Sequence, residues 1–67
     1  MDRGRLIKSL AVAEGITMTE LANRLNISRQ ALYKRLNGKM LLETYEECLN
    51  TLGYELYYGK DGDIRKL

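Results

Sequence analysis

Apolar residues in the first three quarters of the chain recur at helical spacing, with polar residues between them. This pattern predicts helices over residues 2–14, 18–25, 28–37 and 42–52, with glycines at or just after the ends of three of them. Their expected inner faces are Leu6, Ile7, Leu10 and Ala11; Leu21, Ala22 and Leu25; Leu32 and Leu36; and Leu42, Tyr45, Cys48, Leu49 and Leu52. Four short amphipathic helices of this kind predict one small, mainly α domain with a shared apolar core.

The pattern changes after Gly53, where Tyr-Glu-Leu-Tyr-Tyr at residues 54–58 favours a strand. Residues 59–62 have turn composition, and residues 63–67 can return as a second strand or fray. The first strand can therefore form a hairpin with residues 63–67, pair with the same strand of a second copy, or cover its own core. We favour the dimer, because an unpaired strand with apolar side chains invites association. The expected dimerisation residues are Tyr54, Leu56, Tyr57 and Tyr58, in an element over residues 54–67 that follows a helical domain over residues 1–53.

Residues 17–38 hold two helix start signals separated by a short turn. Thr17 with Glu20 matches a capping box, and Ser28 can cap the next helix in the same way. Asn26 stands where the chain needs a left-handed residue, a conformation that asparagine tolerates better than most residues. The apolar staple pairs are Ile16 with Leu21 and Ile27 with Leu32. Two short helices around a turn of about three residues predict a helix-turn-helix, which places its second helix in the DNA major groove; the alternative is an ordinary helical hairpin.

The net charge of +2 is unevenly distributed. Residues 1–39 carry eight basic and three acidic side chains, a net +5, whereas residues 40–67 carry three basic and six acidic ones, a net −3. Between Leu21 and Leu42 there is no acid, and the basic residues are Arg24, Arg29, Lys34, Arg35 and Lys39. Such polarity indicates one face for a polyanion and a back turned away from it.

The composition argues against several other classes of protein. A chain of 67 residues supports a single domain, and its one cysteine, Cys48, allows no intrachain disulfide. Without histidine, structural zinc is not expected, and we expect no other metal or cofactor. There is no nucleophile pair or phosphate-binding loop, and Glu43, Glu46 and Glu47 have the pattern of a solvated helix face, so an enzyme is not expected. No apolar run is long enough for a membrane span and no signal peptide is evident, so we expect a cytoplasmic protein.

The run L-A-N-R-L-N-I-S-R-Q-A-L-Y-K-R-L-N-G-K at residues 21–39 resembles the helix-turn-helix of the lambda-repressor-like superfamily, which includes the Cro, C1 and Xre regulators of phages and bacteria. The resemblance covers about residues 2–53, and the strand that follows is similar to the C-terminal extension through which small members dimerise. It implies a four- to five-helix bundle with a short C-terminal β-strand or hairpin. It also implies a homodimeric, sequence-specific regulator of double-stranded DNA, of the repressor type.

Two parts of the sequence depart from the family pattern. Met18 stands where many members carry a glutamine that contacts DNA. Leu36 stands where many carry an acid that pairs with an arginine of the first helix, and Arg35 stands where an apolar residue is usual. We therefore expect Leu32 and Leu36 to face inward and Arg35 to face solvent or phosphate.

If Leu32 and Leu36 face inward, the polar residues of the same helix lie on its solvated side. Arginine can donate two hydrogen bonds to guanine, and glutamine can pair with adenine. The expected base-contacting residues are Arg29, Gln30, Tyr33 and Lys34. The expected backbone-contacting residues are Thr17, Met18, Thr19, Ser28, Arg35, Asn37 and Lys39, which lie at helix N-termini or carry donors beside the helix.

Another class of function is compatible with the same sequence. The acidic C-terminal half of the chain has several tyrosines, and its strand and acidic fourth helix would suit a protein-interaction adaptor, antitoxin-like or phage-encoded, that binds a protein partner. Such an adaptor does not need Arg29, Gln30 and Lys34 on a solvated face, so these residues discriminate between the two functions. RNA binding is electrostatically compatible, but no aromatic stacking platform on a sheet is evident.

Overall fold

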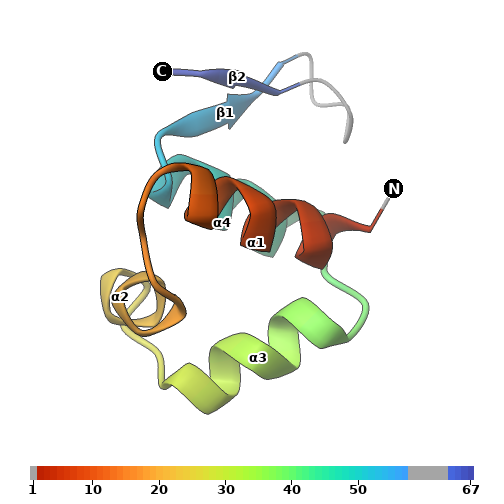
Figure 1. The fold of residues 1–67 in the computed structure, drawn as a ribbon. Coiled ribbons are helices and arrows are strands. Elements are labelled where there is room, and N and C mark those ends of the chain that lie inside the picture. The colour runs from red at the N-terminus through yellow and green to blue at the C-terminus, as the bar shows by residue number, and fades with distance from the viewer. Residues whose placement is uncertain (1, 58–63) are drawn as a thin grey trace.

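The computed structural model describes residues 2–57 and 64–67, which form four helices and a two-stranded hairpin (Figure 1). The elements are α1 (Arg3–Ala13), α2 (Met18–Arg24), α3 (Arg29–Asn37), α4 (Leu42–Thr51), β1 (Tyr54–Leu56) and β2 (Ile64–Lys66). The predicted mainly α fold with a C-terminal hairpin is confirmed, and the helix ends lie within one residue of their expected positions. None of the described helices is long and apolar enough to cross a membrane.

The core lies where all four helices meet. Its fully buried members are Ile7, Ala11, Leu21, Ala22, Leu32, Leu36, Met40, Tyr45, Cys48, Leu49 and Leu52. Most of the expected inner residues belong to this set, and Leu6, Leu10 and Leu25 are half-buried against it. The prediction for Leu42 is wrong: its side chain is 42% exposed, because it is the first residue of α4 and Met40, just before the helix, is the residue that enters the core there.

The other elements are arranged around the pair of helices α1 and α4. In Figure 1, α1 and α4 lie side by side, α3 runs below them, and α2 lies at one end, against α3. The hairpin covers the upper side, where β1 packs on α4. The hairpin and α3 therefore lie on opposite sides of the α1–α4 pair.

Close backbone packing fixes α1 on α3. A Cβ atom built on Gly4 would lie 2.0 Å from the carbonyl oxygen of Leu36, so the two helix backbones approach more closely than any other residue type allows at this position. Arg3, one residue earlier, donates a hydrogen bond to the carbonyl of Met40, and its guanidinium lies 5.6 Å from the ring centroid of Tyr45. The start of α1 is thus bound both to α3 and to the segment that leads into α4.

The hairpin pairs within the chain. β1 and β2 are antiparallel, with Tyr54 opposite Lys66, Glu55 opposite Arg65 and Leu56 opposite Ile64. Of the predicted pairings, the structure contains the intrachain hairpin. Because β1 is paired with β2, an unpaired strand is no longer a reason to expect a dimer that pairs through this strand. The strand is also shorter than expected, and Tyr58 and the predicted turn at residues 59–62 lie outside the described residues.

Glu14 anchors the hairpin to the end of α1. Its Oε2 accepts a hydrogen bond from the Tyr54 hydroxyl at 2.7 Å and lies 3.1 Å from the Lys66 ammonium nitrogen. These two partners, the hydroxyl more than the ammonium, hold the pKa of the Glu14 carboxyl below its usual value. In turn, the carboxylate raises the pKa of both Tyr54 and Lys66.

Candidate nucleic-acid interface

The joint between α2 and α3 has the predicted helix-turn-helix geometry. The amide of Ile27 donates to the carbonyl of Ala22 and that of Asn26 to Asn23, which together form the Schellman closure of a helix. Asn26 has φ +58°, the left-handed conformation expected for it, and it is the one non-glycine residue with positive φ in the described part of the chain. Three residues, 25–27, therefore connect the end of α2 to the cap of α3.

Both predicted caps are confirmed. The Thr17 hydroxyl accepts a hydrogen bond from the amide of Glu20 at 3.1 Å, and the Ser28 hydroxyl accepts one from Ala31 at 3.0 Å. The side chain of Glu20 differs from the capping-box prediction, because it pairs with the guanidinium of Arg24 one turn later in α2. This ion pair lies within α2, and α3 itself carries basic side chains and no acidic residue.

The solvated side of α3 carries the predicted base-contacting residues. Leu32 and Leu36 are buried, as expected, and Arg29, Gln30 and Lys34 are exposed. Tyr33 is half-buried, and the Arg29 guanidinium carbon lies 5.6 Å from its ring centroid. Four side chains able to contact base edges thus lie on the first two turns of one helix.

The predicted backbone-contacting residues fall into three places. At the start of α2, Thr17 and Thr19 are exposed, but the side chain of Met18 packs against the core and leaves only its backbone amide for DNA. Ser28 is exposed at the start of α3, beside Arg29. Asn37 lies at the far end of α3, where its Oδ1 accepts a hydrogen bond from the Lys8 ammonium at 3.1 Å.

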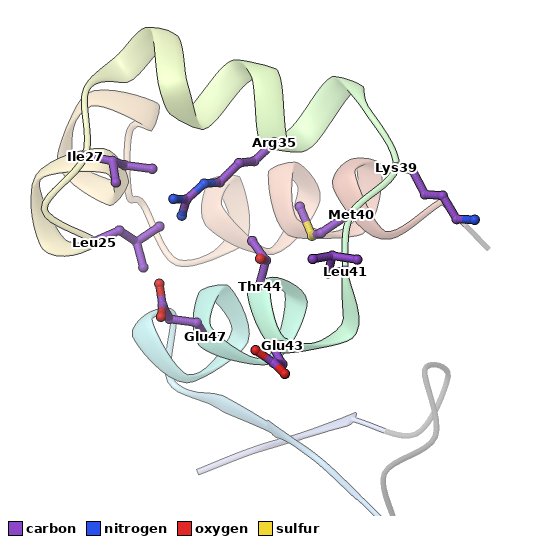
Figure 2. A pocket seen from close by; sticks show the side chains of 9 residues that line it. All are labelled: Leu25, Ile27, Arg35, Lys39, Met40, Leu41, Glu43, Thr44 and Glu47. Atoms are coloured by element: carbon purple, nitrogen blue, oxygen red, sulfur yellow. The ribbon is translucent and has the colours of Figure 1, made fainter.

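Arg35 and Lys39 lie apart from this set. Figure 2 shows the Arg35 side chain reaching from α3 into a cleft between α3 and α4, and Lys39 lines the same cleft at its edge, with its ammonium group directed outward. The cleft has a volume of about 510 Å³, and its other lining residues are Leu25, Ile27, Met40, Leu41, Glu43, Thr44 and Glu47. The α3 side of the cleft carries the basic side chain of Arg35, and the α4 side carries the carboxylates of Glu43 and Glu47. Arg35 is therefore solvated as predicted, but on a different flank of α3 from Arg29.

The residues of α1 that contact the C-terminal end of α3 were not predicted from the sequence. Gly4, Arg3 and Lys8 all lie on α1 and contact Leu36, Met40 and Asn37, at the C-terminal end of α3 and just beyond it. Arg3, an arginine of the first helix, donates a hydrogen bond to a backbone carbonyl and lies against an aromatic ring. The sequence held one usable signal, a glycine inside a predicted helix, which often marks close backbone packing.

The C-terminal residues expected to dimerise have mixed positions. Tyr54 and Leu56 are half-buried against the core of their own chain. This position was predicted by the alternative in which the C-terminal segment covers the core of its own chain. Tyr57 is 40% exposed, with the Arg65 guanidinium 4.7 Å from its ring centroid, and Leu67 is 73% exposed. Among the described residues of this segment, the exposed large apolar side chains are thus Tyr57, just after β1, and Leu67, just after β2.

A family comparison bears directly on this arrangement. Residues 7–58 match the family model HTH_3, described as helix-turn-helix, and the match spans α2, α3 and both caps. The chain belongs to this family. Helix-turn-helix proteins of this Cro/C1 type are DNA-binding regulators, which agrees with the resemblance seen in the sequence. Comparison with curated proteins and with solved structures gave no match.

Within the helix-turn-helix family pattern, the departures noted in the sequence have structural explanations. Leu36 stands in the place of the acid with its side chain buried in the core, and its backbone carbonyl lies against Gly4. In this chain Arg3 donates a hydrogen bond to the carbonyl of Met40, just beyond the end of α3. The orientation of α3 is therefore maintained by packing and a backbone hydrogen bond.

Proposed function

We propose that the protein is a sequence-specific transcriptional regulator of the repressor type that inserts α3 into the major groove of double-stranded DNA. The observation that carries the proposal is that Arg29, Gln30 and Lys34 are exposed along α3 beside half-buried Tyr33, while Leu32 and Leu36 of the same helix are buried. A helix in the major groove reads bases chiefly through its N-terminal half, where Arg29, Gln30 and Tyr33 lie, with Lys34 just beyond them. The proposed activity is binding, and no catalytic step is part of it.

Arg29 and Gln30 are proposed to read bases directly. Both lie in the first turn of α3 and both are exposed. A guanidinium can donate two hydrogen bonds to guanine O6 and N7, and a carboxamide can pair with adenine N6 and N7. Tyr33 and Lys34 lie one turn further along and would contact the next bases.

Phosphate contacts are proposed on both sides of this reading surface. Thr17, Thr19 and the amide of Met18 would bind on the α2 side, and Ser28 at the start of α3, where first-turn amides lack carbonyl partners. Lys39 and Asn37 would bind beyond the other end of α3. Arg35, which lies over the cleft, would contribute mainly through its charge.

A homodimer that pairs through its C-terminal elements is part of the proposal. Because the hairpin and α3 lie on opposite sides of the α1–α4 pair, contacts between two hairpins would leave both α3 helices uncovered (Figure 1). The described part of the chain measures 30 × 24 × 18 Å. The proposed dimer requires that the two copies meet at the edges of their hairpins with both α3 helices on the same side, about 34 Å or one turn of DNA apart.

Selection of bound duplexes from a random pool, repeated at low and moderate salt, tests the proposal. We expect enrichment of a palindromic or nearly palindromic site, with half-sites about one helical turn apart. If each half-site binds three to four phosphates, log K should fall against log salt with a slope of about −6. Weak, unselective binding that modest salt abolishes would refute the proposal.

The cleft between α3 and α4 favours a second candidate, a protein-interaction adaptor. It is bordered by Leu41, which is 68% exposed, and by the acidic residues Glu43 and Glu47 of α4 (Figure 2). An adaptor that binds through this cleft would be insensitive to Arg29→Ala and Gln30→Ala and sensitive to Leu41→Ser. A DNA-binding regulator would show the opposite pattern in duplex selection.

A further inference from the structure

Arg29 and Tyr33 form an isolated pair on the solvated side of α3. They are four residues apart, so their side chains lie one above the other on the helix surface. The guanidinium carbon lies 5.6 Å from the ring centroid, within the range of a cation–π contact. Arg29 is exposed and Tyr33 is half-buried, so the ring is the better-ordered member of the pair.

A ring is a suitable partner for an arginine that must bind guanine. A planar guanidinium that stacks on an aromatic ring makes this contact through the flat face of the guanidinium. The N–H donors lie in the guanidinium plane and therefore stay available for hydrogen bonds. A carboxylate partner would use the same donors that guanine O6 and N7 need. Arg24 shows this other arrangement in the same protein, since its guanidinium is paired with the carboxylate of Glu20.

We propose that Tyr33 is a positioning residue whose ring holds Arg29 ready for guanine. This inference rests on the proposed function and deepens it, because it assigns the guanine preference of α3 to a pair of side chains. Without the ring, the Arg29 side chain is ordered only when it binds guanine, and this ordering costs free energy. The preference of Arg29 for guanine over other bases therefore falls. The hydroxyl of Tyr33 remains available for a contact of its own.

Two substitutions at residue 33 separate the ring from the hydroxyl. Tyr33→Phe keeps the aromatic face, and we expect it to keep the guanine preference at the position that Arg29 reads. Tyr33→Leu keeps a bulky apolar side chain on the helix but removes the face, and we expect the guanine preference to fall about two- to fivefold per half-site. Binding to random duplex and the salt slope should be the same in all three proteins, because no charge changes.

A double-mutant cycle shows whether Tyr33 acts through Arg29. Relative affinities for the selected site and for its single-base variants are measured in the parent, Arg29→Ala, Tyr33→Leu and the double variant. At the base position that Arg29 reads, we expect Tyr33→Leu to have no further effect on base preference once Arg29 is alanine. Equal effects of Tyr33→Leu at that position in both backgrounds would overturn the inference, because the ring would then act on that base without Arg29.

NMR of the DNA-free protein tests the pairing independently. The δ-methylene protons of Arg29 should show upfield ring-current shifts in the parent and in Tyr33→Phe, and these shifts should be absent in Tyr33→Leu. Identical Arg29 shifts in all three proteins would overturn the inference while leaving DNA binding intact. A parent that selects no site but shows the ring-current shifts would instead refute the proposed function.

Discussion

Substituting Gly4 by alanine should push α1 off the end of α3. The added Cβ would lie 2.0 Å from the carbonyl oxygen of Leu36 and 2.8 Å from its carbonyl carbon, and both are backbone atoms that cannot rotate away. A separation below 3.0 Å is essentially never seen, so the helices must move apart by about 1 Å or more. The movement would also stretch the hydrogen bond from neighbouring Arg3 to the carbonyl of Met40.

The expected cost combines two opposing effects. Overpacking of a close contact costs about 1–3 kcal/mol, and rigid backbone atoms place this site at the upper end of that range. Alanine is also a better helix former than glycine by about 1 kcal/mol, which offsets part of the cost. We therefore expect Gly4→Ala to lower the free energy of unfolding by about 1–2 kcal/mol, or Tm by roughly 4–16 °C for a domain of this size.

Thermal and urea denaturation followed by circular dichroism measure this cost. Ser9→Ala is the matched control, because Ser9 is exposed on the same helix and its replacement reports helix propensity alone. The control should be equal to the parent or slightly more stable. If Gly4→Ala were also as stable as the parent, the close packing of α1 on α3 would be refuted.

Three further outcomes follow from particular residues. Asn26→Ala should lower the free energy of unfolding by about 1 kcal/mol, whereas Asn26→Gly should keep it, because glycine adopts positive φ without strain; equal losses would contradict the left-handed turn. Since the folded-state pKa of Glu14 is lowered, its carboxylate stabilises the protein above its ordinary pKa, and this stabilisation is lost as pH falls through the lowered value. Thermal melts should therefore show a stability difference between the parent and Glu14→Gln near pH 7 that shrinks at acid pH; a constant difference would contradict the anchor. Burial, with a smaller effect from the charge of Glu47, raises the pKa of the Cys48 thiol to about 11. Native protein should consequently react slowly with a thiol reagent at pH 8 and quickly once unfolded, and fast native reaction would contradict the buried position.

The helix-turn-helix could be predicted from sequence because its signals are local. The hydroxyls of Thr17 and Ser28 cap helices that begin at the next residue, and Asn26 adopts positive φ within the same short segment. Each of these signals involves residues at most five positions apart. The inward orientation of Leu32 and Leu36 followed equally from helical periodicity.

Features that depend on distant contacts could not be predicted in this way. Gly4 meets Leu36 across 32 residues, and Glu14 meets Tyr54 across 40. Nothing in the local pattern indicates which partner a glycine or a carboxylate has in the folded chain. The strand after Gly53 was predicted as a strand, but its partner also depended on tertiary structure, and it pairs with residues 64–66.

The most direct test of the account compares Arg29→Ala with Lys39→Ala on the selected duplex and on random duplex. We expect Arg29→Ala to cost about 1–3 kcal/mol on the selected site and much less on random DNA, because it removes a base contact. Lys39→Ala should weaken both complexes by similar factors and make the salt slope shallower by about 1. Equal losses on selected and random DNA for both variants would contradict the claim that α3 reads the base sequence.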